Sequence, residues 1–404
     1  MWVFTGMRDI NKDSYFSREL WELQPLLSGV GYYEKLKETC SRILPRYFCG
    51  TRRVGMSLTG GIDGRMIMAW ANCRPGELPC YTFGSPYRDC ADVRIAHRVA
   101  KKCGQSHNTI IIGNEFFSEF PLLAEKAVFV SDGTMDVSGA VELFANRIAS
   151  GIAPVRLTGN YGSEILRGNV AFKPGASDQT LWEPAFSELV RNASATYQRE
   201  QQCHKVSFIA FKQVPWHHYS RLSVEQSQIT MRSPYLDNDL VALMYQAPPD
   251  LVLSNEPSLR LIAEGNADLA KIQTDRGLLH HPIPVVTKMQ HLYAEFTAKA
   301  EYAYDYGMPQ WVAGIDGVLE PLHLEKLFLG RHKFYHFRVW YRDRLSQYLK
   351  DILLDSRTLS RPYLVGKRLE KILMSHIEGK GNYATAIHKA LTAELIQRQL
   401  IEMK

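Results

Sequence analysis

Apolar residues in the first half of the chain fall alternately into short continuous runs and into runs with helical spacing. Leu36, Cys40 and Ile43 lie three or four positions apart, which predicts a helix over residues 32–44 that ends at Pro45. Beyond it, continuous apolar runs predict strands over residues 53–58, 78–84, 106–112 and 153–157. Spaced apolar positions between them predict helices over residues 63–73, 89–103, 114–127 and 139–150. Strands that alternate with helices are typical of an α/β fold with a parallel doubly wound sheet.

The second half of the chain has a different pattern, because the strand signal fades after about residue 178. Aromatic and basic residues at helical spacing predict long helices over 338–354 and 383–401. The first thirty residues show no clear periodicity. We therefore expect a lead-in segment (1–31), an α/β domain (32–178) and a mainly α-helical part (179–404) that completes the substrate cleft.

The composition is that of an ordinary globular protein, with 404 residues of which 45% are apolar and 22% charged. No apolar stretch approaches the roughly eighteen residues that cross a bilayer. The N-terminus lacks the features of a secretory signal, so we expect a cytoplasmic protein without a membrane span. The seven cysteines form no CxxC pair, which favours reduced thiols over a zinc site. A net charge of +6 does not by itself indicate a nucleic-acid partner.

The most distinctive chemical feature is a glycine-rich turn, Thr59-Gly60-Gly61, that follows the strand expected at 53–58. Ligands of open α/β sheets bind at the carboxyl ends of the strands, and adjacent glycines let backbone N–H groups and a helix N-terminus meet a phosphate. The turn lacks the lysine of a Walker loop and does not match GxGxxG. Asp63 is unfavourable beside a phosphate unless a divalent cation lies between them, which suggests Mg²⁺.

Four motifs in order resemble the synthetase domain of asparagine synthases, within the ATP pyrophosphatase (PP-loop) superfamily. The resemblance runs from about residue 32 to residue 277. The first motif, residues 58–63 (LTGGID), looks like the SGGxDS pyrophosphate loop. The others are residues 82–84 with 92–100 and His107, then residues 158–164 (TGNYGSE), and finally residues 232–237 (RSPYLD). Four matches in the right order make the resemblance specific.

This resemblance implies a nucleotide-binding fold and an ATP-dependent, AMP-forming carbon–nitrogen ligase, as in asparagine biosynthesis. A small-molecule carboxylate would be activated by adenylation and then attacked by ammonia or an amine to give an amide. The binding roles that it implies are phosphate contact by Thr59, Gly60, Gly61, Asp63 and Gly64, adenine contact by Leu58 and Phe83, and closure over the nucleotide by Thr158 and Gly159. The candidate catalytic residues are Asp63, Glu164 and Arg276, and Asp63 is the candidate Mg²⁺ ligand.

The sequence also departs from the family pattern. The departures are Gly64 in place of a serine, Asn160 and Ser163 in place of acidic residues, and about Leu278 in place of a lysine. Ser163 removes one expected Mg²⁺ ligand, and the absent lysine leaves Lys271 or Arg276 as substitute cations. Loss of an electrostatic stabiliser of this kind typically raises a reaction barrier by about 3–4 kcal/mol. Activity therefore does not follow from the resemblance alone.

The source of nitrogen is a separate question. Glutamine-dependent members of the family begin with a nucleophilic cysteine after the initiator methionine and carry a glutaminase domain before the synthetase domain. This sequence begins Met1-Trp2-Val3, and only the lead-in segment precedes the first expected helix. We therefore expect the glutaminase half to be absent. Nitrogen would come from ammonia, an amine or a separate glutaminase, unless the sequence is a truncated form of a longer protein.

Simpler structural interpretations stand beside these roles. Gly60 and Gly61 could form a tight turn with Asp63 as N-cap, and Glu164 could cap the helix after it. Arg232 and Asp237 could brace an interface, and the histidines at 217–218 and 280–281 could be hydrogen-bonded or solvated. Residues 332–344 could form an amphipathic core helix with basic residues toward solvent. The buried face of that helix would be Phe337, Trp340, Tyr341 and Leu345. Two further functions stay open: a catalytically degenerate nucleotide-binding or scaffold protein, and a ligase that uses an amine other than ammonia.

Overall fold

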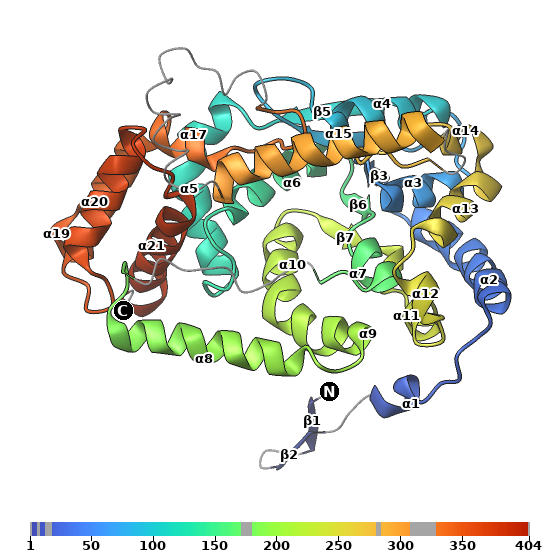
Figure 1. The fold of residues 1–404 in the computed structure, drawn as a ribbon, viewed down its shortest axis with the longest axis horizontal. Coiled ribbons are helices and arrows are strands. Elements are labelled where there is room, and N and C mark those ends of the chain that lie inside the picture. Colours follow the sequence, from blue (N-terminus) through green and yellow to red (C-terminus); the bar gives the residue numbers. More distant parts are fainter. Residues whose placement is uncertain are drawn as a thin grey trace.

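The structure is a computed structural model that describes residues 2–5, 9–12, 18–170, 180–279, 284–307 and 329–402. Its centre is a five-stranded parallel sheet in the order β5-β4-β3-β6-β7 (Figure 1). The strands are β3 (Val54–Ser57), β4 (Cys80–Gly84), β5 (His107–Ile111), β6 (Val155–Thr158) and β7 (Thr230–Arg232). The first four lie where the apolar runs predict them, and the α/β fold with a parallel sheet is confirmed.

Helices cover both faces of this sheet. They include α2 (Gly29–Phe48), α3 (Ile62–Ala69), α4 (Ala91–Lys102), α5 (Asn114–Val130) and α6 (Gly139–Ile152). Consecutive residues of β4 enter different cores: Cys80 packs with α2, α3 and α4, whereas Tyr81 packs with α5 and α6. The central strands β3, β4 and β6 are buried along their whole length, as expected for parallel strands with helices on both sides.

The later part of the chain is mainly helical, as predicted. Its elements are α7 (Gly162–Arg167), α8 (Pro184–Glu200), α9 (Lys205–Phe208), a π-helical segment (Ile209–His218), α10 (Tyr219–Gln226), α11 (Asn238–Met244), α12 (Pro249–Val252), α13 (Glu256–Gly265), α14 (Ala267–Ala270), α15 (Pro284–Tyr302), α17 (Phe337–Arg342), α18 (Ser346–Leu353), α19 (Ser356–Leu359), α20 (Gly366–Ile377) and α21 (Ala384–Ile396). The helices α17 to α21 form a group at one end of the molecule, next to α5 (Figure 1). None of the described helices combines the length and the apolar character needed to cross a bilayer.

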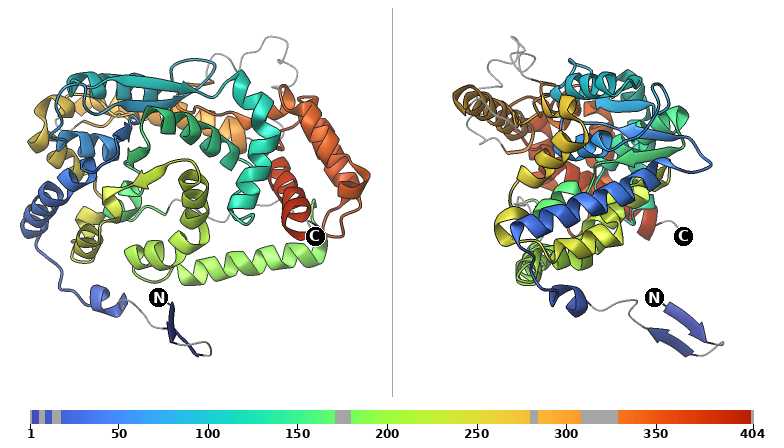
Figure 2. Two further views of the ribbon diagram at one scale, coloured as in Figure 1. Left: turned by 180° about the vertical axis from the view of Figure 1, so that it is seen from behind. Right: turned by 90° about the vertical axis from the view of Figure 1, so that its right-hand side faces the viewer.

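Three short strands were not predicted from the sequence. An antiparallel pair, β1 (Trp2–Thr5) and β2 (Asp9–Lys12), lies apart from the main body near α1 (Arg18–Glu22) (Figure 2). The third is β7, which has three residues and pairs with β6. A run this short gives no periodic signal. Because β7 belongs to the sheet, the α/β layer takes a strand from beyond the expected domain limit at residue 178.

The predicted end of the first helix at Pro45 is wrong, because α2 continues to Phe48. A proline interrupts a helix through its missing N–H group and its ring, and both effects are least costly near the end of the helix. Tyr47 and Phe48 pack against the core that contains the rest of α2, and this packing offsets the loss.

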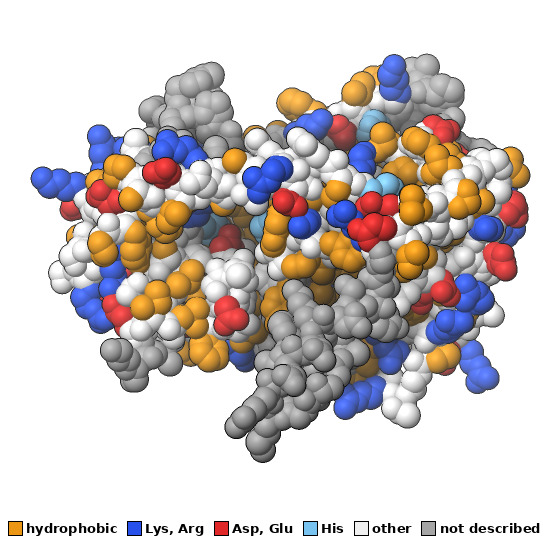
Figure 3. Space-filling view, turned by 90° about the horizontal axis from the view of Figure 1, so that it is seen from below, with side chains coloured by type: hydrophobic (Ala, Val, Ile, Leu, Met, Phe, Trp, Pro, Cys, Tyr) orange, Lys and Arg blue, Asp and Glu red, His pale blue; other side chains and the backbone are white. Residues whose placement is uncertain are grey.

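The helix predicted over 338–354 is also interrupted. Helix α17 ends at Arg342 and α18 begins at Ser346, and the backbone N–H of Leu345 donates to the carbonyl of Trp340 across the break at 2.8 Å. The predicted buried face, Phe337, Trp340, Tyr341 and Leu345, is confirmed. The predicted basic solvent face is wrong for Arg338, which is buried over the ring of Tyr304 at 4.0 Å. Figure 3 shows charges of both signs interspersed with apolar side chains on one face of the molecule.

Candidate active site

A cavity of about 300 Å³ opens where β3, β4 and β6 end, at the carboxyl edge of the sheet. The structure brings most of the predicted site residues together in its wall: Leu58, Thr59, Gly61, Asp63, Gly64, Phe83, Thr158, Gly159 and Glu164. Gly60 and Arg276 do not line it, although the backbone N–H of Gly60 donates a hydrogen bond to Asp92, which does. The placement agrees with the rule that ligands of open α/β sheets bind at this edge.

The glycine-rich turn leads directly into α3. Gly61 is the N-cap residue of this helix, so the interpretation of Asp63 as N-cap is wrong, and Asp63 lies in the first turn. A Cβ atom added to Gly61 would meet only the Thr59 hydroxyl, at 3.4 Å, which leaves this position open toward the cavity. At Gly60 a Cβ atom would come within 2.9 Å of Cβ of Asp275. The turn therefore needs glycine at Gly60 for packing, whereas Gly61 is free to approach a ligand.

The side chain of Asp92 accepts a hydrogen bond from one backbone N–H group of this turn. The N–H of Gly60 donates to Oδ1 of Asp92 at 2.6 Å, and Asp92 also lines the cavity. Burial, together with the nearby charge of Asp275, raises the pKa of Asp92 from 3.8 to about 7, although the Gly60 N–H and Arg276 oppose the shift. Asp92 is thus more than an ordinary first-turn acid of α4.

The raised pKa of Asp92 predicts a pH dependence of stability. The unfolded chain ionises this carboxyl near pH 3.8, but the folded chain holds its proton until about pH 7. Between these values the folded state binds the extra proton, so this group's contribution to the free energy of unfolding falls as the pH rises through this window. We expect the melting temperature to fall more steeply from about pH 5 to about pH 8 in the wild type than in Asp92→Asn. Equal slopes in calorimetric scans of the two proteins would contradict this assignment.

The loop after β6 lies directly on the N-terminus of α3. A Cβ atom on Gly159 would come within 2.5 Å of the backbone nitrogen of Gly64, and one on Gly162 would come within 2.5 Å of Cγ of Asp63. These distances are far shorter than van der Waals contact, so only glycine fits at either position. The third motif, residues 158–164, therefore packs directly on the first, with backbone against backbone at Gly159.

Asp63 is held by a buried arginine. Nη2 of Arg167 lies 2.8 Å from both carboxylate oxygens of Asp63. The hydroxyl of Tyr235 donates to the backbone carbonyl of Asp63 at 2.8 Å. Burial raises the pKa of Asp63, the charge of Arg167 opposes this shift, and the nearby Glu164 adds to it. Asp63 is therefore fixed in place by both its side chain and its backbone.

The carboxylates of Asp63 and Glu164 are the candidate ligands for Mg²⁺ in this cavity. Glu164 accepts a hydrogen bond from the hydroxyl of Ser163 at 2.7 Å. Among the described residues, no group of three or more histidine, cysteine or acidic side chains is arranged to hold a metal ion. Magnesium is commonly held by one or two carboxylates plus substrate phosphates. The residues present fit Mg²⁺ in that mode, provided that Arg167 releases one oxygen of Asp63.

The substitute cations named from the sequence lie outside the cavity wall. Arg276 pairs with Asp275 at 3.4 Å, beside the glycine-rich turn, and its side chain is 40% exposed. Lys271 pairs with Asp268 and is mostly exposed. Arg232 and Asp237, which the sequence left between substrate contact and an interface brace, both bond to residues at the end of α2. None of these four side chains contributes to the cavity wall.

Two other arginines line the cavity, and sequence reasoning missed both. Arg156 of β6 and Arg221 of α10 share the buried carboxylate of Glu225, with Nη1 of Arg156 at 3.7 Å and Nε of Arg221 at 3.0 Å from the same oxygen. Arg221 also pairs with Glu142 at 2.9 Å. Burial raises the pKa of Glu225, and the two arginines oppose the shift. The signal that could have found Arg156 is a charged residue inside a short buried strand.

Arg156 also reaches the predicted adenine contact. Its guanidinium lies 5.1 Å from the centre of the Phe83 ring, and it donates to Ser57 at the end of β3. The edge of Phe83 meets Phe334, with the ring centres 5.7 Å apart. Leu58 is almost fully buried beside them. The aromatic end of the cavity is thus assembled from three strands, β3, β4 and β6, and from the segment that carries Phe334.

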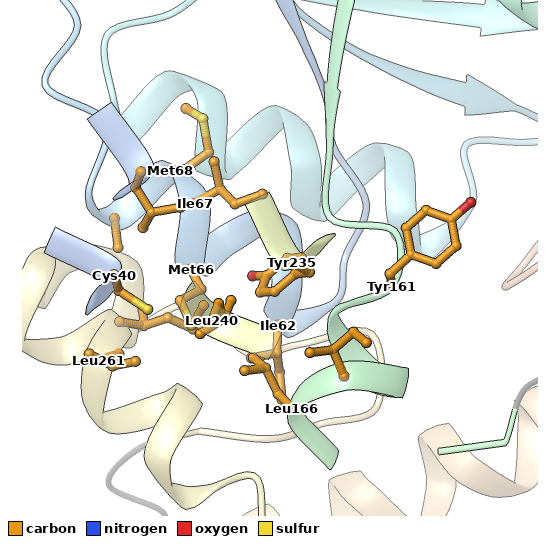
Figure 4. Close-up of a cluster of buried hydrophobic side chains, with 14 of the residues drawn as sticks. Cys40, Ile62, Met66, Ile67, Met68, Tyr161, Leu166, Tyr235, Leu240 and Leu261 are labelled. Carbon is orange, nitrogen blue, oxygen red and sulfur yellow. The ribbon is translucent and has the colours of Figure 1, made fainter. Parts of the chain in front are cut away.

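Tyr161 is a further residue of the cavity wall that sequence reasoning missed. Its backbone is left-handed, with φ of 72°, a conformation that is uncommon for a bulky side chain and costs about 1–3 kcal/mol. Its side chain belongs to the hydrophobic cluster that includes Tyr235 and Leu166, and Figure 4 shows the ring at the edge of that cluster. The ring meets His218 edge to face at 4.8 Å, and the buried hydroxyl has no hydrogen-bond partner among the described residues. His218 is likewise buried in the wall, where burial lowers its pKa to about 4. The histidines at 280–281, named from the sequence, lie outside the described residues.

The fold and this cavity place the chain among α/β proteins with a ligand site beyond the carboxyl ends of a parallel sheet. A model of the asparagine synthase family matches residues 46–265, more than half of the chain, and the protein belongs to this family. The matched segment contains all the strands of the sheet and nearly all residues of the cavity wall. A search of curated proteins gave no match.

Proposed function

We propose that this protein is an AMP-forming amide ligase that binds ATP and a carboxylate substrate in the cavity at the edge of the sheet. The observation that carries the proposal is the convergence of the glycine-rich turn, the N-terminus of α3 and two carboxylates on one cavity. A helix N-terminus with free backbone N–H groups favours phosphate, and the carboxylates suit the divalent cation that accompanies it.

The proposed reaction has two steps. A carboxylate oxygen attacks the α-phosphorus of ATP and pyrophosphate leaves, which turns a poor electrophile into one with a good leaving group. An amine nitrogen then attacks the activated carbonyl carbon, AMP leaves, and the nitrogen loses a proton as the amide forms. Mg²⁺ bound by Asp63 and Glu164 would neutralise charge on the phosphates.

The residues have distinct proposed roles. Thr59, Gly61 and the first turn of α3 hold the phosphates, Leu58 and Phe83 flank the adenine, and Thr158 with Gly159 closes over the nucleotide. Arg276, from the loop beside Gly60, stays the predicted catalytic cation. Arg156 and Arg221 are better placed by geometry, because they line the cavity whereas Arg276 does not. Preorganised positive charge of this kind stabilises the charge that develops on the leaving phosphates.

A second candidate function is nucleotide binding without catalysis. The observation that favours it is the contact of Arg167 with both oxygens of Asp63. Asn160 and Ser163 supply no carboxylate in this loop, and Leu278 is an apolar residue that packs against the core. A protein of this kind would keep the nucleotide cavity and have lost the chemistry.

Calorimetric titration and an AMP-release assay distinguish the two candidates. The protein is titrated with ATP in the presence and absence of Mg²⁺. AMP release is then followed across a panel of carboxylates, with ammonium and with small organic amines as nitrogen donors. A ligase gives ATP binding and carboxylate-dependent AMP, whereas a degenerate protein gives binding alone. Absence of ATP binding would contradict both candidates.

A further inference from the structure

A second cavity, of about 270 Å³, adjoins the candidate active site. It is bounded by the connection between α5 and α6, by α6 itself, by the end of the π-helical segment with α10, and by residues 335–337. Glu142 and Arg221 line both cavities. Their ion pair, with Oε1 and Nη2 2.9 Å apart, therefore forms the partition between the two.

The size of this cavity does not match ammonia. Ammonia is comparable to water, whose share of liquid volume is about 30 Å³. The cavity is several times larger, which suits an organic molecule. Its wall combines the rings of Tyr335 and Phe337 with the polar side chains of Ser138 and Asp136. Ligand sites commonly pair an apolar surface with a few polar groups in this way.

The charge of the wall favours a cation. Asp136 and Glu142 are acidic, and among the described wall residues Arg221 is the basic side chain that opposes them. Glu225 behind the wall shares the charge of Arg221 with Glu142. Burial lowers the pKa of His217, so this imidazole is neutral at pH 7.

Asp136 is the carboxylate of the wall that no wall cation neutralises. It is exposed, and it accepts a hydrogen bond from the backbone N–H of Ser138 at 2.9 Å and a second from the Ser138 hydroxyl. Lys389 of α21 lies outside the wall; burial lowers its pKa, and the charge of Asp136 opposes that shift. The ring of Tyr335 lines the same cavity and already has Nζ of Lys333 4.7 Å from its centre.

We propose that the second cavity binds the amine substrate of the ligation as its ammonium ion, and that this substrate is a small organic amine rather than ammonia. The bound ammonium ion gives one proton to solvent before its nitrogen attacks the activated carboxylate. The inference rests on the proposed function, which needs a nitrogen nucleophile next to the activated carboxylate. The amine lies one ion pair away from the catalytic cavity. A carboxylate in this place would meet the negative charge of Asp136.

Ligand-observed NMR with matched probes tests this assignment. The probes are n-butylamine, 1,4-diaminobutane and, with the charge reversed, butyrate. The variants are Asp136→Asn, which removes the charge, and Ser138→Trp, which fills the cavity. Asp132→Asn is the matched control, because Asp132 is exposed on the same connection between α5 and α6 but does not line the cavity.

We expect both amines to bind and butyrate not to bind. Asp136→Asn should weaken amine binding at least about tenfold, Ser138→Trp should remove it, and Asp132→Asn should leave it unchanged. Equal binding of butyrate, no binding of either amine, or amine binding that survives both cavity variants would overturn the inference. Titrating the same samples with ATP separates the two hypotheses, since ATP binding without amine binding refutes only the second cavity's role.

Discussion

Replacing Asp63 with asparagine should reduce ATP–pyrophosphate exchange by at least about a hundredfold, with the carboxylate that gives AMP in the release assay. The amide has nearly the shape of the carboxylate but cannot carry the charge that attracts Mg²⁺. It also leaves Arg167 without its ionic partner at the proposed phosphate site. The measurement is incorporation of labelled pyrophosphate into ATP. Asp89→Asn is the matched control, because Asp89 is an exposed acid at the same edge of the sheet, outside the cavity wall.

A double variant separates a role of Asp63 in catalysis from a role in holding Arg167. Asp63→Asn with Arg167→Met removes both charges and avoids an unpaired buried cation, which is the costly outcome when one partner of a buried pair is lost. If Asp63 acts on the substrate, exchange stays low in the double variant although its melting temperature recovers. Exchange that returns with Arg167→Met would show that Asp63 serves only to hold the arginine, and unchanged exchange in Asp63→Asn itself would refute the assigned role.

Gly159→Ala should destabilise the fold by about 1–3 kcal/mol or more, as overpacking of a tight contact does. The added methyl group would meet the backbone nitrogen of Gly64 at 2.5 Å and the backbone carbon of Asp63 at 3.0 Å. Backbone atoms at a helix N-terminus cannot turn aside as the end of a flexible side chain can. The loop after β6 would have to move away from α3, which would also open the cavity. Denaturant unfolding measures the loss of stability.

Gly151→Ala is the control for this variant. Gly151 lies in the last turn of α6, and a Cβ atom there would meet nothing within 4 Å. Alanine in a helix with free space should stabilise the protein by about 0.4–1 kcal/mol, because it restricts the unfolded chain. The two substitutions are chemically identical and should have opposite signs. A Gly159→Ala protein as stable as the wild type would show that this loop is not held against α3 as described.

Sequence reasoning reached the fold and part of the site, because both depend on local patterns. The strand β3, the glycine-rich turn and α3 are consecutive, so their placement follows from one continuous stretch of chain. Where prediction failed at Pro45, packing of Tyr47 and Phe48 outweighed the local propensity for a helix to end. Tertiary contacts of this kind cannot be recognised from the local pattern of apolar and polar residues.

The rest of the site could not be predicted, because it joins residues that are far apart in the chain. Glu142 and Arg221 are separated by 79 positions, and nothing in the spacing of either pairs them. Tyr161 was missed for another reason. Its backbone is left-handed, a conformation expected of glycine, so the residue type gives no sign of it. Arg276, in contrast, was named from the sequence, and the structure places it in a loop beside the cavity, outside the wall.

A last consequence concerns Arg65 of α3, whose buried guanidinium donates to the carbonyls of Gly60, Ile272 and Gln273. Two of these three acceptors lie beyond residue 265, where the family match stops. A chain trimmed to that match would leave the guanidinium of Arg65 without two of its three acceptors, next to the glycine-rich turn. A shorter chain that keeps these hydrogen bonds must therefore extend past the matched segment, at least through Gln273.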